Sequence, residues 1–181
     1  MRKLKYHEKK LLKKVDFISW EADNNLHEIK IMNKYCVQKR EDFTRYNKLS
    51  AKIRKLADMI KELDMTDPFR KEAADKFLPL LHSMSLIKKK NELEECSRVT
   101  ASTFCRRRLP VVMTRSKMAP SVKVSTKFVE QGHVRIGPNT VMDPAFLVSR
   151  NMEDFVTWVD QSAIKRHIAT YNGELDDFDL M

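Results

Sequence analysis

Apolar residues recur at three- and four-residue steps along most of the chain, a pattern that predicts a fold rich in helices. The longest such stretch runs from about Arg40 to about Leu63. It predicts one long helix, which either packs inside the chain or pairs with a partner helix as a coiled coil. Asp67 followed by Pro68 is typical of a helix start, because aspartate caps the first turn and proline needs no N–H there. Thr100 can cap a further helix that leads into the second half of the chain.

Between residues 104 and 148 the pattern predicts two short helices. Leu109 and Val112 lie at helical spacing, and Pro110 suits a first turn. Residues 118–120 interrupt this helix, after which Ser121 can cap a second one. The two helices would therefore be joined by a tight turn. The inner face of the second helix would consist of Val122, Ser125 and Val129.

A small β-structure is expected after the second helix. Gly132 suits the left-handed position that ends a helix, and residues 133–136 favour a strand. Residues 137–139 are a turn signal, and Val141 and residues 146–148 are expected to return as short strands over the helices. The fold class predicted is therefore α+β, with a helical N-terminal half followed by a small domain of two short helices on a small β-sheet.

The charge of the chain narrows the class of partner. Its 181 residues include 35 basic and 25 acidic ones, a net charge of +10. This excess indicates a polyanion, with nucleic acid as the first candidate and a charged membrane surface as its competitor. No long apolar run or lipidation signal supports the membrane, and the basic start leads into more charge rather than into a secretory signal. We therefore expect a protein of a reducing compartment with no membrane partner.

Cations alternate with apolar positions in the two short helices, so these helices would present one basic face to phosphate groups. Any one of these cations could equally be a solvated surface charge, whereas the cluster as a whole favours a nucleic-acid surface. The cations of this predicted face are Arg106, Arg107, Arg108, Arg115, Lys117, Lys123 and Lys127.

The motifs of common enzymes are absent from the sequence: it has no dinucleotide-binding or P-loop glycine pattern, no zinc-protease motif and no nucleophile elbow. Cys105 stands beside Arg106, which would favour a thiolate, but no pattern of histidine and acid accompanies it. The three cysteines are odd in number and widely spaced, which suits neither disulfides nor zinc. We predict a structural Cys105, no enzymatic activity, no metal and no cofactor.

The two ends of the chain differ in charge. Residues 1–25 form a basic segment with an apolar thread, which is either a surface helix docked on its own domain or an arm that reaches RNA or a protein partner. Residues 165–167 are expected on a C-terminal helix. Residues 171–181 form an acidic tail, which is a solvated end, a segment that docks on a basic neighbour, or a shield over the RNA face.

The basic unit resembles the ribosomal S4 RNA-binding domain. The resemblance lies in Arg-Arg-Leu at 107–109, which opens the first helix, and Gly-His-Val-Arg-Ile at 132–136, which follows the second. In that family the exposed face of the two helices and the entry to the next strand lie against structured RNA. By position, the resemblance implies that the residues near RNA are Arg107, Arg108, Lys117, Lys123, Lys127, His133 and Arg135.

The resemblance extends beyond this unit. Residues 34–70 are similar to the helical half of eukaryotic and archaeal S4 proteins. Residues 4–21, 104–113, 128–138 and 143–160, with the acidic ending at 176–180, resemble the family of U3 small nucleolar ribonucleoprotein subunits. The implied divisions are residues 1–25 for the basic arm, 26–103 for the helical S4-like region, 104–170 for the S4 domain with a C-terminal helix, and 171–181 for the acidic tail.

This resemblance implies a non-catalytic RNA-binding assembly factor of the small-subunit processome in the nucleolus. It would act with the M-phase phosphoprotein ten and other processome proteins. It would help the U3 small nucleolar RNA pair with precursor rRNA, so that processing to the small-subunit 18S rRNA can occur. Two rivals remain: a structural small-subunit ribosomal protein of the S4 family, and a protein-interaction adaptor built on the long helix from Arg40 to Leu63.

Overall fold

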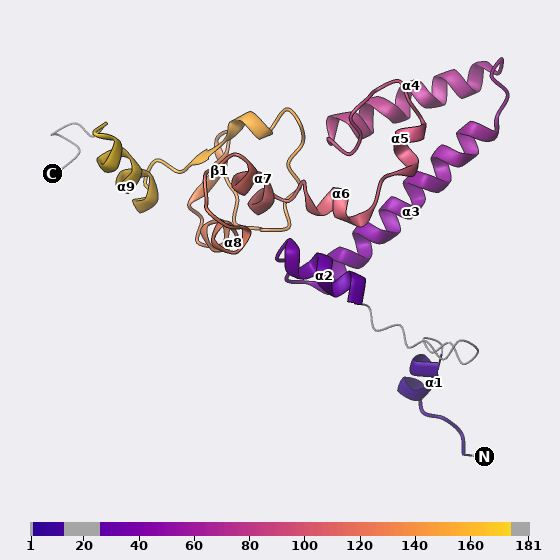
Figure 1. Ribbon diagram of the computed structural model, residues 1–181, viewed down its shortest axis with the longest axis horizontal. Coiled ribbons are helices and arrows are strands. Elements are labelled where there is room, and N and C mark those ends of the chain that lie inside the picture. Colours follow the sequence, from indigo (N-terminus) through magenta and orange to yellow (C-terminus); the bar gives the residue numbers. More distant parts are fainter. Residues whose placement is uncertain (1, 13–25, 175–181) are drawn as a thin grey trace.

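The computed structural model describes residues 2–12 and 26–174. In Figure 1, α2 to α6 form a helical half, and α7, α8 and a small sheet form a second half beside it. The elements are α1 (Tyr6–Leu12), α2 (Leu26–Lys34), α3 (Arg40–Glu62), α4 (Pro68–Ser83), α5 (Glu94–Ser97), α6 (Ala101–Cys105), α7 (Leu109–Arg115), α8 (Val122–Glu130), β1 (Val134–Ile136), β2 (Asn139–Thr140), the 3-10 helix η1 (Glu153–Phe155), β3 (Val156–Trp158) and α9 (Ala163–Asn172).

The helical half is organised around α3, whose bounds agree with the expected long helix. One face of α3 buries apolar side chains, Phe43 and Tyr46 among them, and packs against α4, α5 and α6. The Tyr46 ring stacks on Phe104 of α6, with ring centres 5.6 Å apart and nearly parallel planes. This packing inside the chain agrees with the first of the two roles predicted for the long helix.

Local capping sets the starts of the neighbouring helices. The Asp67 carboxylate accepts a hydrogen bond from the Phe69 amide at 2.9 Å, and Pro68 occupies the first turn of α4. A capping box between Thr100 and Thr103 opens α6. These starts confirm the sequence predictions, because a cap depends on residues within one turn of it.

In the second half, α7 and α8 pack on each other and on the sheet. Ser121 caps α8, and Gly132 ends it with φ +74°. A Cβ at Gly132 would also lie 3.1 Å from the Met142 side chain, so glycine fits here on both counts. The sheet is antiparallel, with strand order β2-β1-β3, and pairs Arg135 with Thr140 on one side and with Thr157 on the other. Its core consists of Leu109, Val112, Met113, Val129, Val134, Ile136, Val148 and Val156.

The segments expected as strands at Val141 and at residues 146–148 are not strands of the sheet, although the Val141 amide donates to the Val134 carbonyl of β1 and Leu147 forms an isolated antiparallel bridge with Arg108. The strand beside β1 is Asn139–Thr140, and the third strand comes from Val156–Trp158. Residues 146–148 instead bind the start of α7: the Leu109 amide donates to the Phe146 carbonyl, and the Val148 amide to the Arg107 carbonyl. Since these backbone groups are already paired there, the segment does not extend the sheet.

The remaining predictions concern the ends and the membrane. The expected C-terminal helix is present as α9, which Ser162 caps. Residues 13–25 of the basic segment and residues 175–181 of the acidic tail lie outside the described residues, and so do the interpretations that concern them. Within the described part of the chain, no helix has both the length and the apolar character needed to cross a membrane.

Candidate nucleic-acid interface

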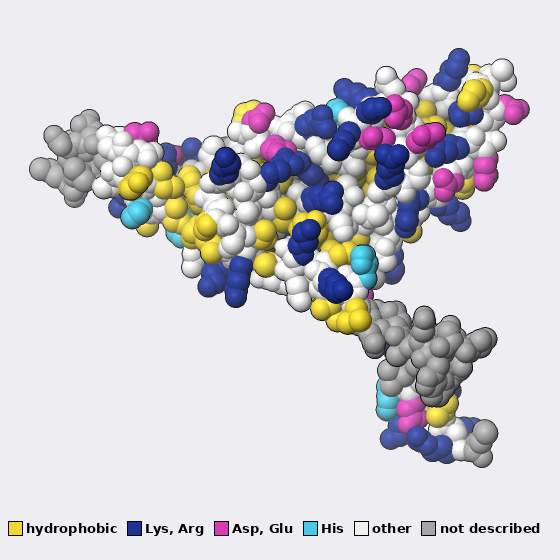
Figure 2. Space-filling view, viewed as in Figure 1, with side chains coloured by type: hydrophobic (Ala, Val, Ile, Leu, Met, Phe, Trp, Pro, Cys, Tyr) yellow, Lys and Arg dark blue, Asp and Glu magenta, His cyan; other side chains and the backbone are white. Residues whose placement is uncertain are grey.

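The helix pair α7–α8 carries an exposed basic face, defined here as Arg115, Lys117, Lys123 and Lys127. The opposite sides of the two helices are buried in the core, so the alternation of cations and apolar residues separates them as predicted. Lys117, in the turn between the helices, has φ +62°, which bends the chain sharply at this point. In the described part of the chain, none of the three lysines forms a salt bridge, whereas Arg115 pairs with Glu153. The charges of the lysines are therefore available to a ligand. Figure 2 shows Lys and Arg side chains below α8 and, more densely, over α6 and α7.

Arg107 and Arg108 do not extend this face, and the prediction that they do is wrong. Their relative exposures are 4% and 2%. Arg107 donates through Nε and Nη2 to the Val148 carbonyl at 3.0 and 2.8 Å, and it pairs with Glu153 at 2.9 Å. Burial lowers the pKa of Arg107. This guanidinium therefore holds the loop after β2 against α7 and is not open to RNA.

Arg108 connects the two halves of the molecule. Its Nη1 lies 3.4 Å from the Asp42 carboxylate and 3.4 Å from the Tyr46 hydroxyl, both on α3. The backbone of Arg108 forms an isolated antiparallel β-bridge with Leu147, which belongs to the second half. Burial raises the pKa of Tyr46, and the charge of Arg108 opposes that shift. Arg108 is thus a structural cation that fixes the second half on the long helix.

The remaining arginine of the run, Arg106, is exposed and lies in a groove of about 480 Å³ between the halves. We call this the junction groove. Its cations also include Lys88, Arg115 and Arg150, and its carboxylates are Glu153 and Asp154. Arg150 reaches it because its amide donates to the Ser83 carbonyl and its side chain to the Ser85 hydroxyl.

Sequence reasoning missed Lys88 and Arg150 as members of a basic surface, because they lie in loops before and after the S4-like helices. The signal that could have pointed to Lys88 is the run of three lysines at 88–90. A lysine run is usually solvated, and only the fold brings one end of this run beside α6 and α7.

His133 and Arg135 lie at the other end of the unit, near α9. The His133 Nδ1 is 3.0 Å from the Ser162 hydroxyl, and Arg135 pairs with Asp160 at 2.6 Å. Lys165 also pairs with Asp160, at 2.5 Å. The hydrogen bond from Lys165 and the charge of Arg135 lower the pKa of Asp160, so this carboxylate offsets part of the cationic charge there. The structure therefore gives these two residues partners within the protein, unlike the lysines of the basic face.

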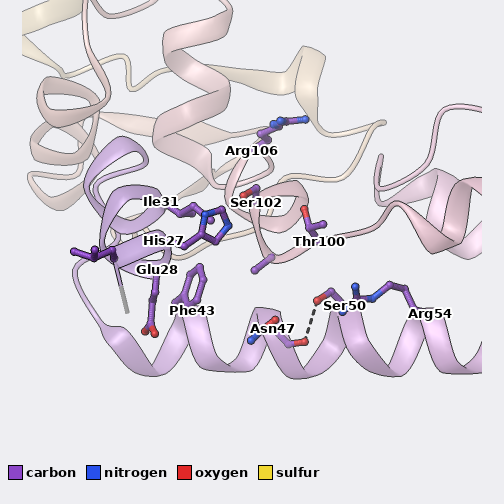
Figure 3. Close-up of a pocket in the computed structure, with 12 residues that line it drawn as sticks. His27, Glu28, Ile31, Phe43, Asn47, Ser50, Arg54, Thr100, Ser102 and Arg106 are labelled. Carbon is purple, nitrogen blue, oxygen red and sulfur yellow. Dashed lines mark hydrogen bonds between the residues drawn. The ribbon is translucent and has the colours of Figure 1, made fainter. Parts of the chain in front are cut away.

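A second groove, of about 560 Å³, lies between α2, α3 and α6 (Figure 3). Arg54 lies at one end, and His27 and Glu28 of α2 lie at the other, with the hydroxyls of Thr100 and Ser102 between them. Glu28 pairs with Arg40 at 2.9 Å. This lining lacks the paired carboxylates or the nucleophile with an adjacent base that hydrolytic or transfer chemistry uses.

The described residues include no cluster of three or more groups that could hold a metal ion. Cys105 is fully buried, and burial raises the pKa of its thiol to about 11, while the charge of Arg108 acts in the opposite direction. Burial also raises the pKa of Cys96. This environment agrees with the structural role predicted for Cys105, because a nucleophilic cysteine needs a lowered pKa.

Native alkylation should distinguish the three thiols. At pH 8, only about one Cys105 thiol in a thousand is ionised, given a pKa of about 11, and burial also excludes the reagent. We expect iodoacetamide to modify half-buried Cys36 first, and Cys96 and Cys105 only after unfolding. Peptide mass spectrometry over time measures this order. A Cys105 that reacts as fast as Cys36 in the folded protein would contradict the structural role.

Comparison with known proteins agrees with this architecture. The family model "Ribosomal protein S4/S9 N-terminal domain" matches residues 3–106, and the model "S4 domain" matches residues 107–154. The U3 small nucleolar ribonucleoprotein protein IMP3 of Homo sapiens is 55% identical, over 99% of this chain and 98% of its own. Its Saccharomyces cerevisiae counterpart is 48% identical, over 99% of each chain.

More distant relatives are small ribosomal subunit proteins. The small ribosomal subunit protein uS4 of Thermoplasma acidophilum is 24% identical, over 82% of this chain and 75% of its own. The identity to the IMP3 proteins is about twice as high and reaches both ends of the chain. The chain therefore belongs to the family of the U3 small nucleolar ribonucleoprotein protein IMP3, which carries the S4 domain.

Proposed function

We propose that this protein is a non-catalytic RNA-binding factor in the assembly of the small ribosomal subunit. The observation that carries the proposal is the exposed basic face of α7 and α8, in an S4 domain of an IMP3-family chain. Its lysines have no salt-bridge partner among the described residues, so a polyanion can bind them without first displacing a carboxylate. The junction groove adds Lys88, Arg106 and Arg150 to the same RNA surface.

The recognition proposed is mainly of the RNA backbone. Lysine and arginine side chains on short helices can follow phosphates along a groove edge, whereas the deep, narrow major groove of A-form RNA does not admit a helix. Shape would therefore be selected more than sequence. His133 and Arg135 would lie at the margin of this surface, because their side chains already have protein partners.

The RNA partners proposed are the U3 small nucleolar RNA and precursor rRNA, and the names of the IMP3 relatives support the first of them. Two RNA strands that approach one another repel through their phosphates, and a basic surface lowers that repulsion. The protein would thereby stabilise a short U3–precursor duplex without nucleotide hydrolysis. We place it in the nucleolus, in the small-subunit processome, with the M-phase phosphoprotein ten and other processome proteins.

Sedimentation tests this role against that of a resident ribosomal protein. Lysate of cells that express a tagged full-length chain is separated on a sucrose gradient, and each fraction is probed for the tag, U3 RNA and mature small-subunit RNA. We expect the tagged chain to follow U3 RNA in particles larger than the small subunit. Co-migration with mature small subunits and translating ribosomes would contradict the proposal and would favour the structural ribosomal protein.

A further inference from the structure

One flank of α3 exposes apolar side chains. Leu49, Leu56 and Met59 have relative exposures of 45%, 40% and 49%, although the neighbouring face of the same helix buries Phe43 and Tyr46 in the core. In Figure 1, α4, α5 and α6 all lie on one side of α3, and the opposite side of this helix is bare along most of its length. The exposed flank is thus a continuous helix surface and not a set of scattered loop residues.

The spacing on this flank is that of a helix-pairing surface. Leu49, Lys52, Leu56 and Met59 follow one another at steps of three, four and three, which are the a and d positions of a heptad pattern. We call these four residues the α3 seam. The methylene stem of Lys52 can lie along apolar surface while its ammonium group stays in water. About two heptads of seam fit within the 23 residues of α3, enough for a partner helix of three to four turns.

Cations lie within the seam, at Lys52, and beside it, at Lys48 and Lys55. Lys48, Lys52 and Lys55 are exposed, and none of them forms a salt bridge with another described residue. Arg45 is also exposed and lies 3.9 Å from Asp42. The cations on this flank are Arg45, Lys48, Lys52 and Lys55, while carboxylates appear near its two ends, at Glu41 and Glu62. The flank therefore combines an apolar stripe with positive charge along one side, where Lys48 and Lys55 lie one heptad apart.

This combination favours a protein partner over RNA. Phosphates would neutralise the lysines but would leave the leucine and methionine side chains in water, because an RNA backbone offers no apolar surface to cover them. A helix with apolar residues along one stripe and aspartate or glutamate beside it satisfies both features, in the way that acidic e and g positions pair with basic ones.

We propose that the α3 seam docks an acidic amphipathic helix from another protein. The surface is separate from the basic face of α7 and α8, so the protein could hold RNA on its second half while its helical half is tethered to a protein of the same particle. The proposal does not depend on RNA binding, and RNA affinity can be measured separately in every variant.

Site-specific crosslinking identifies the occupant. A photoreactive amino acid replaces Leu56 in the full-length chain expressed in cells, and in a control it replaces Lys71, which is exposed on α4. Crosslinked peptides are sequenced. We expect the Leu56 position to capture one segment of another protein, with apolar residues at steps of three and four and flanking acids, and the Lys71 position not to capture it. Crosslinks to RNA, to this same chain or a second copy, or to a neutral or basic segment would overturn the proposal, as would no crosslink.

A synthetic peptide of the captured segment then gives the affinity for the purified full-length chain. The variant Leu56→Gln/Met59→Gln keeps good helix formers on the surface of α3 and should weaken peptide binding about 10-fold or more. Lys48→Glu/Lys55→Glu should weaken it by a similar factor at low salt. Urea unfolding confirms that both variants fold, and their affinity for U3 RNA should stay within about 2-fold of the parent. Unchanged peptide binding in both folded variants would overturn the proposal.

Discussion

Replacement of Asp42 by alanine is expected to destabilise the protein by roughly 3–5 kcal/mol, the cost of removing one partner from a buried ion pair. The substitution leaves the Arg108 guanidinium, which is 2% exposed, with only the Tyr46 hydroxyl beside it on α3. An unpaired charge that is out of contact with water is strongly unfavourable. Urea unfolding followed by circular dichroism measures the loss as a lower unfolding free energy.

Asp58→Ala is the matched control, because Asp58 is an exposed aspartate of the same helix and forms no salt bridge with a described residue. It should change the unfolding free energy by less than about 0.5 kcal/mol. The double variant Asp42→Leu/Arg108→Met should recover much of the loss, because an apolar pair replaces the ionic one without leaving a buried charge. If Asp42→Ala behaves like Asp58→Ala, Arg108 does not hold the two halves together as described.

Charge reversal on α8 is expected to produce the largest loss of RNA affinity. Two unit charges 4 Å apart in water interact by about 1 kcal/mol, so the change from attraction to repulsion amounts to about 2 kcal/mol per residue. Lys123→Glu/Lys127→Glu should therefore lower the affinity for transcribed U3 RNA by roughly 10²- to 10³-fold. Both side chains are exposed on one helix, so the fold should remain intact. Filter binding with the purified full-length chain gives the two dissociation constants.

Lys71→Glu/Lys76→Glu on α4 is the control for this experiment. It changes the net charge of the chain by the same amount, on a helix of the other half, with two lysines that are also exposed. If only long-range electrostatic attraction is lost, the RNA affinity of this control variant should fall by well under 10-fold at 0.15 M salt, where the Debye length is about 8 Å. Equal losses in the two double variants would mean that RNA responds to net charge and not to the basic face.

The parts of the fold that could be predicted from sequence are those that local chemistry decides. Asp67 and Ser121 cap helices because the amides they bind lie two or three residues away. Gly132 adopts a left-handed conformation that suits glycine and few other residues. Lys123 and Lys127 could be assigned to a surface because the apolar periodicity of α8 places them opposite its buried face.

The errors come from long-range pairing. Arg107 and Arg108 look the same in sequence as exposed Arg106, but their partners Glu153 and Asp42 lie 46 and 66 residues away. A single sequence does not show which cation of the run meets a carboxylate. Strand β3 has only three residues. In the sequence, so short an apolar run cannot be distinguished from part of the apolar stripe of a helix.

The salt dependence of RNA binding tests the central claim most directly. The proposed surface contains seven exposed cations, Lys88, Arg106, Arg115, Lys117, Lys123, Lys127 and Arg150, of which Arg115 already pairs with Glu153. If each of the other six displaces a counterion, log K should fall with log salt with a slope of about −4 to −5, a loss on the order of 10³-fold between 50 and 200 mM. The affinity of the wild-type chain for U3 RNA, measured across this range, should follow that line. A slope between 0 and about −1, or no binding at 50 mM salt, would contradict an RNA interface built on phosphate contacts.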